Sequence, residues 1–220
     1  MRTRTLLTGA LLCAAVFGPI KAGTIVSLAG PVVAGGGLGE APQQQIGGVE
    51  FTLPVAITGG TAVVMLDSSG NESVTAWLTN AVGPGTTTSN VLASDTFSVS
   101  VGTQQPYTTL SGLNVGPGTY YLVLEAVSQS NDVGWDYTNS PVITGTVNAG
   151  GLGAEQTPPF PFGPSAPFGQ TTGDYLFQVT GNQIASTPEP ATGVLVLTAI
   201  ACLIVWSSVA GRKRARAGSA

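Results

Sequence analysis

The alternation of apolar and polar residues predicts β-strands along most of the chain. Alternating residues point to opposite faces of a strand, so every second side chain can enter a core. Residues 97–101 alternate strictly, and Tyr175, Phe177 and Val179 share one face. The same reasoning predicts strands at residues 24–28, 49–57, 62–66, 74–78, 107–110, 119–127 and 142–147.

Glycine-rich and proline-rich turns separate these segments, and no sustained helical period occurs between the two terminal regions. About nine short strands at this spacing predict an all-β fold, a two-sheet antiparallel sandwich of jelly-roll type. Residues 30–48 and 150–173 are too rich in Gly and Pro to be expected as central strands. The sandwich is therefore predicted at 49–181, after a Gly/Pro/Gln-rich lead-in at 23–48.

Both ends of the chain have the composition of export signals. Two arginines precede an apolar stretch at residues 6–16, and the small residue Ala22 follows. This pattern predicts a signal peptide at residues 1–22 that signal peptidase removes. Near the other end, residues 191–210 carry no charge, and 20 helical residues span about 30 Å, the thickness of a bilayer core. We expect one transmembrane helix there.

A basic stop made of Arg212, Lys213, Arg214 and Arg216 lies in the tail at 211–220. Basic residues beside a membrane span stay in the cytoplasm, so the preceding domain is expected outside the bacterial inner membrane.

The linker at 182–190 contains Pro188, Glu189 and Pro190, directly before the apolar segment and the basic stop. This order resembles the PEP-CTERM sorting signal, and the resemblance covers residues 187–220. It implies recognition by an exosortase and removal of the tail after export, so that the product passes from a transient membrane anchor to the cell surface or the medium. A plain tail anchor that is never processed remains the alternative.

A second resemblance lies in residues 49–181. The run Gly116-Pro117-Gly118-Thr119-Tyr120-Tyr121-Leu122-Val123-Leu124 and the closing run 175–179 are similar to exported choice-of-anchor β-domains. The resemblance implies an exported β-domain and defines no activity.

Charge excludes one class of partner. Residues 23–187 contain ten acidic residues and no Lys or Arg, a formal charge of −10 that the whole-chain value of −4 conceals. Such a surface repels phosphate backbones, so no nucleic-acid partner is expected. Both cysteines, Cys13 and Cys202, lie in the terminal segments, so the sandwich must be stabilised by its core rather than by disulfides.

The catalytic groups available to the exported domain are few. The chain has no His, and residues 23–187 have no Cys, Lys or Arg, which removes the usual bases, thiols and amines. We therefore predict that the protein is not an enzyme. Glu125, Asp132 and Asp136 leave a carboxylate glycoside hydrolase as a remote alternative.

Two binding hypotheses involve residues 128–139. Asp132 and Asp136 offer hard oxygen ligands for Ca²⁺, the one cofactor left open, although a solvated polar loop with Asx turns is the favoured interpretation. Trp135, Asp136 and Tyr137 together could contact a sugar, through ring stacking and hydroxyl hydrogen bonds, unless the rings pack inside the domain.

These observations predict an exported, exosortase-processed protein of the cell surface or extracellular matrix, with a non-catalytic structural or interaction role. The alternative is a carbohydrate-binding module, and exopolysaccharide is one candidate partner outside the cell.

Overall fold

The computed structural model describes six stretches of the chain, all within one compact unit, Ile20–Ile184. They are residues 22–38, 44–127, 133–148, 151–156, 169–171 and 173–184. The expected signal sequence, Asp132, the sorting motif, the apolar segment and the basic stop lie outside the described residues, apart from Ala22. The described part contains one 3-10 helix, η1 (Thr88–Asn90), and no helix with the length and apolarity needed to cross a membrane.

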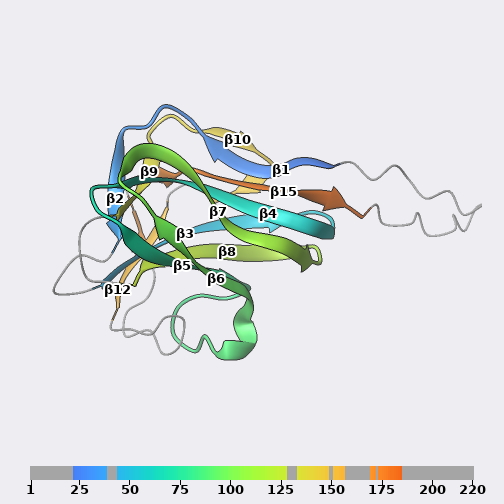
Figure 1. Cartoon of the computed structure of the whole chain (residues 1–220). Coiled ribbons are helices and arrows are strands. Elements are labelled where there is room, and N and C mark those ends of the chain that lie inside the picture. Colours follow the sequence, from blue (N-terminus) through green and yellow to red (C-terminus); the bar gives the residue numbers. More distant parts are fainter. Residues whose placement is uncertain are drawn as a thin grey trace, which may run out of the picture. The chain divides into compact units, whose positions relative to one another are not determined.

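Two antiparallel sheets pack face to face as a sandwich, so the predicted all-β, two-sheet fold is confirmed (Figure 1). In the first sheet, of eight strands, the order is β10-β1-β15-β4-β9-β14, with β2 paired to β9 and β7 to β4. Its strands are β1 (Ala22–Ala29), β2 (Ala34–Leu38), β4 (Ile57–Ser68), β7 (Gly102–Val115), β9 (Val133–Thr138), β10 (Val142–Thr144), β14 (Asp174–Tyr175) and β15 (Phe177–Gln183).

The second sheet has seven strands in the order β13-β12-β3-β8-β5-β6, with β11 paired to β3. Its strands are β3 (Gln44–Leu53), β5 (Glu72–Thr79), β6 (Val91–Val99), β8 (Gly118–Ala126), β11 (Thr146–Val147), β12 (Leu152–Gln156) and β13 (Gly169–Gln170).

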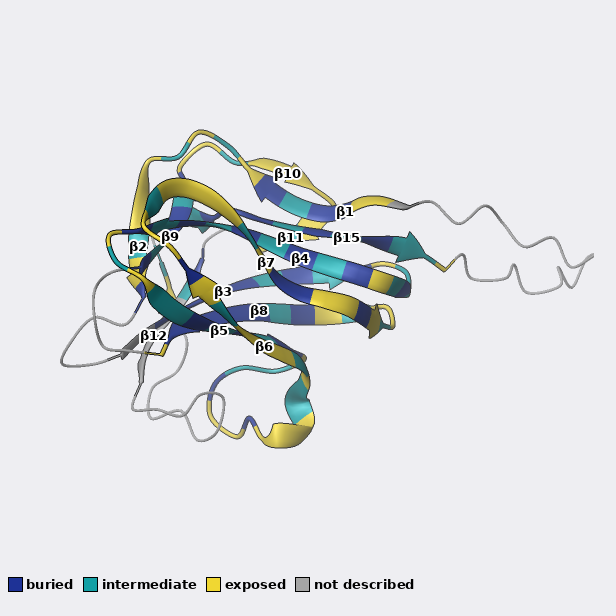
Figure 2. Ribbon diagram, viewed as in Figure 1, coloured by how far each residue is buried: buried dark blue, intermediate teal, exposed yellow. Residues whose placement is uncertain are grey.

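The core lies between the sheets and follows the alternation of the longest strands (Figure 2). In β4 every second residue from Ala62 to Leu66 is buried, as are Leu122 and Leu124 in β8. The rings of Phe51 in β3 and Phe177 in β15 lie 5.6 Å apart and join the two layers. Burying such apolar area contributes the main favourable term in folding.

The sandwich begins earlier than predicted. Strands β1 and β2 lie within residues 22–38, and residues 44–48 form the first half of β3, which lies between β12 and β8. The expectation that no central strand lies in 30–48 was therefore wrong. Gly47 explains why: a Cβ there would lie 3.1 Å from the Trp135 ring and 3.2 Å from Leu38. This glycine leaves room for core side chains rather than making a turn.

Strand β9 was also missed, because its Gly134 and Asp136 look like loop residues. Its backbone nevertheless pairs with β2 and β14, and its first residues pair with the end of β4. Residues 133–138 are thus part of the sheet, and side chains along them must alternate between its two faces.

The chain enters and leaves this unit at one end of the first sheet. Ala22 is the cross-strand partner of Asn182, and Gln183 is the partner of Ile57 at the start of β4. Because β4 is 12 residues long, its other end lies about 35 to 40 Å away. The features around Ser68 are therefore remote from both chain ends.

Candidate functional site

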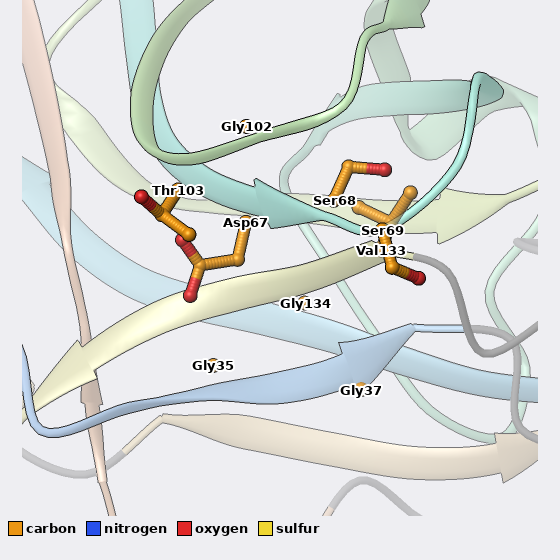
Figure 3. A pocket seen from close by; sticks show the side chains of 9 residues that line it. All are labelled: Gly35, Gly37, Asp67, Ser68, Ser69, Gly102, Thr103, Val133 and Gly134. Carbon is orange, nitrogen blue, oxygen red and sulfur yellow. The ribbon is translucent and has the colours of Figure 1, made fainter.

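A pocket of about 440 Å³ lies at that remote end of β4 (Figure 3). Its walls combine four polar residues with several glycines, whose lack of side chains leaves the space open. Figure 3 shows the Asp67 carboxyl group pointing toward the strands that carry Gly134 and Gly35. The polar lining residues are Asp67, Ser68, Ser69 and Thr103.

A β-bulge positions Asp67. Leu66 pairs with Gln105 and Ser68 with Gly102, so β7 has one more residue than β4 across this interval. The bulge gives Gln104 a φ of 51°, a conformation uncommon for a residue with a side chain. The Gln104 backbone N–H donates a 2.5 Å hydrogen bond to Oδ1 of Asp67, which fixes that carboxylate at the pocket wall.

Glycines let β2 and β9 approach each other beside this carboxylate. A Cβ on Gly35 would lie 3.3 Å from the Gly134 Cα, and one on Gly134 would lie 3.2 Å from the Gly35 Cα. The same Gly35 position lies 3.7 Å from Oδ2 of Asp67. A side chain at either glycine would therefore narrow the pocket where Asp67 faces it.

Asp136 is the second acid of the site. Gly134 is the cross-strand partner of Asp67, and Asp136 lies two residues further along β9, so all three lie on one face of the sheet. Asp136 is 0% exposed, and within the described part of the chain neither of its carboxyl oxygens has a hydrogen-bond partner. Burial, followed by the negative charge of Asp67, raises the pKa of Asp136 to about 7.

Two carboxylates in contact are both acceptors, so they need a proton or a cation between them. Glycosidases hold their two carboxyl groups about 5 Å or more apart to make room for the reacting sugar or water. Asp67 is the only acid among the described residues that line this pocket, so no second acid of that lining faces it across the space. Among the described residues, no group of three or more His, Cys, Asp or Glu side chains is arranged to hold a metal.

The acids of the remote glycosidase alternative, Glu125, Asp132 and Asp136, are not brought together in the described residues. Glu125 lies on β8, between the core residues Leu124 and Ala126, so its side chain is on the outer face of the second sheet. Asp136 is on the outer face of the first sheet. These two acids are therefore on opposite sides of the sandwich, while Asp132 lies outside the described residues.

Trp135 does not have the exposure that sugar binding would require. Its side chain is 0% exposed, its ring stacks on Tyr175 at a centroid distance of 4.8 Å, and its Nε1–H donates to the Leu176 carbonyl at 3.0 Å. Tyr137 is half-buried against the same core. Alternation explains the correction, because it turns both rings inward and Asp136 outward, so the three cannot face one sugar.

Asp136 also differs from the expected Ca²⁺ ligand, because it lies on a strand and not on a polar loop. The partner that sequence reasoning missed is Asp67. Asp67 and Asp136 are 69 positions apart in sequence, and no local pattern indicates that β4 and β9 pair in this register.

A second buried acid lies outside the pocket. Glu125 is 7% exposed beside its cross-strand partner Ile46, and burial raises the pKa of its carboxyl group to about 7. With no Lys, Arg or His anywhere in residues 23–187, no basic side chain of the domain can offset that cost.

Comparison of the chain with protein-family models, with curated proteins and with solved structures gave no match.

Replacing Trp135 tests its packing role. We expect Trp135→Ala to lower the free energy of unfolding by about 3 to 5 kcal/mol, because it opens a cavity and removes the hydrogen bond to Leu176. Trp135→Phe, which keeps an aromatic ring, should cost less. Urea unfolding followed by circular dichroism measures both. An alanine variant as stable as the wild type would contradict the buried placement.

Glu125 makes stability depend on pH. Its pKa is raised from 4.5 to about 7, so the folded chain holds this proton more tightly than the unfolded chain does. Its contribution is therefore full below pH 4.5 and is lost as pH rises to about 7. At about pH 8 we expect Glu125→Gln to be more stable than the wild type by about 1 to 2 kcal/mol, a figure reduced for partial solvation.

The measurement is urea unfolding between about pH 4 and pH 8. Asp95→Asn is the matched control, because it removes one negative charge from an exposed position in the same sheet. A gain at high pH that is equal in both variants would mean that overall charge, and not the burial of Glu125, is responsible.

Proposed function

We propose that this chain is an exported, non-catalytic module of the cell surface or extracellular matrix, sorted by an exosortase. In this proposal residues 1–22 are a signal peptide and residues 191–210 are a transmembrane helix that anchors the precursor. The basic stop keeps the tail in the cytoplasm, and cleavage near Pro188, Glu189 and Pro190 separates the tail from a sandwich of jelly-roll type.

The observation that carries the proposal is where the chain enters and leaves the sandwich. Ala22 and Asn182 are cross-strand partners, so both expected processing sites connect to the same end of the first sheet. A tether joined after Ile184 would attach there, about 35 to 40 Å of strand away from the Asp67 pocket. The domain would then present its pocket at the end remote from its attachment.

Cutting after Thr187 would leave every described strand intact, and cutting after Ala22 would remove only the first residue of β1. The last strand, β15, ends at Gln183 and is paired on both sides, with β1 and with β4. A cleavage after Thr187 therefore removes no ladder partner from the sandwich. A domain that stays folded after its tail is removed can act as a component of the cell surface or the extracellular matrix.

Charge supports the same role. Residues 23–187 carry ten acids and no base, so the processed domain would be wholly acidic, with every base of the chain in segments that processing removes. Such a domain repels anionic lipid headgroups and nucleic acids, and it suits divalent cations and neutral polymers as partners. The burial of Trp135 removes the ring on which the carbohydrate-binding alternative depended.

Intact-mass measurement of the mature protein tests the sorting model. In cells with an exosortase we expect a product without the sequence after the 188–190 motif, and in cells without one a product that retains it. In cells with an exosortase, the Glu189→Ala product should retain the sequence after the 188–190 motif, as the wild-type product does in cells without the enzyme. A product that keeps Arg212 to Arg216 in both strains would contradict the proposal.

A further inference from the structure

We propose that the pocket at the end of β4 binds a divalent cation, best matched by Ca²⁺, between the carboxylates of Asp67 and Asp136. The site is carried by the geometry of the described strands. It does not depend on whether the chain is exported or processed.

The first observation is Asp136 itself. Its side chain is 0% exposed, and in the described residues both carboxyl oxygens lack a hydrogen-bond partner. A buried polar group without partners costs free energy, and a buried carboxylate costs more unless a positive charge offsets it. An oxygen pair left unsatisfied in this way indicates a ligand that brings positive charge.

The sequence restricts what that ligand can be. Buried acids in most proteins are paired with Lys, Arg or His, but residues 23–187 contain none of these. No side chain of the domain can therefore neutralise the Asp67–Asp136 pair. The remaining choices are a proton shared by the two carboxyl groups or a cation taken from solution.

The pocket favours a cation. Asp67 is fixed at its wall by the Gln104 N–H, Ser68, Ser69 and Thr103 also line the space, and Asp136 is buried beside it, outside the set of lining residues. A volume of about 440 Å³ holds a cation together with several coordinating waters. A proton shared by Asp67 and Asp136 would use none of this space.

Ca²⁺ is the best match among common divalent cations. It accepts six to eight oxygen ligands in irregular geometry, from carboxylates, carbonyls and water, whereas Mg²⁺ requires a nearly ideal octahedron. Two carboxylates provide up to four oxygens, and the described residues offer no third acidic ligand. We therefore expect a dissociation constant of about 10⁻⁴ to 10⁻³ M, the range of extracellular calcium modules.

Binding would join separate strands. Asp67 is on β4, Asp136 is on β9, and Gln104 on β7 holds the Asp67 carboxylate. A cation between the two acids would link β9 to the end of β4 and relieve their mutual repulsion. Because the unfolded chain lacks this arrangement, binding should stabilise the fold.

The test uses the purified full-length chain in non-ionic detergent, stripped of metal with EDTA and titrated with Ca²⁺ at constant ionic strength. Calorimetric titration measures binding, and thermal unfolding measures stabilisation. At a Ca²⁺ concentration of about ten times the dissociation constant, we expect the wild-type Tm to rise by about 3 to 6 °C. Mg²⁺ should give a smaller rise.

Three variants distinguish Ca²⁺ binding at this site from a general effect of Ca²⁺ on the repulsion between acidic residues. Asp67→Asn and Asp136→Asn keep the side-chain shape, and each should lose the binding heat and most of the Tm rise. Glu125→Gln removes a buried acid on the other face of the sandwich and should keep both. No Ca²⁺ effect on the wild type, as a shared proton predicts, would overturn the proposal, as would an equal Tm rise in all three variants.

If either asparagine variant does not unfold cooperatively, Tb³⁺ luminescence of the wild type decides the question. Trp135 and Tyr137 flank Asp136 in sequence and can transfer excitation to a bound Tb³⁺. We expect luminescence that Ca²⁺ displaces with the affinity found by calorimetry. Luminescence that does not respond to Ca²⁺ would overturn the proposal.

Discussion

The pairing register of β4 and β9 is the constraint on which both the core and the candidate site depend. Leu66 opposite Trp135 places two large side chains in the core, and Asp67 opposite Gly134 places Asp67 and Asp136 on the same outer face. Because side chains alternate with a period of two, a slip by one residue would exchange these faces. The apolar free energy that fixes Trp135 inside the sandwich therefore also brings Asp136 close to Asp67.

The absence of basic side chains from residues 23–187 gives this contact its significance. In a domain with mixed charges, a buried carboxylate can pair with an Arg or a Lys, and that positive charge offsets the cost of burying the carboxylate. Here no such pairing is available to Asp136 or to Glu125, so burial alone raises the pKa of Glu125, and burial together with Asp67 raises that of Asp136. What differs is the surroundings: Glu125 packs beside Ile46, whereas Asp136 lies next to a second acid and an open pocket.

Alternation between neighbouring residues is a local signal, and it predicted the fold class. The segments at 24–28, 62–66, 74–78 and 107–110 lie entirely in strands of the structure, and 119–127 does so apart from its last residue. Alternation failed where a glycine served packing. Gly47 makes room for Trp135 within β3, and Gly134 allows β2 to approach β9, but in the sequence both resemble turn residues. The candidate site was found only in part, since Asp136 was singled out and Asp67 was not. Their proximity depends on a pairing between distant segments, which no local pattern specifies.

The position of the pocket separates the two proposals physically. The chain ends of the described unit meet where Ala22 pairs with Asn182, and the acids meet at the other end of β4. Removing segments beyond residues 22 and 184 changes no residue that lines the pocket and no strand that holds Asp67 or Asp136. Cation binding would thus be the same in an anchored precursor and in a released domain. Sorting would then determine where the acidic sandwich is placed, and the pocket would determine which ion it binds there.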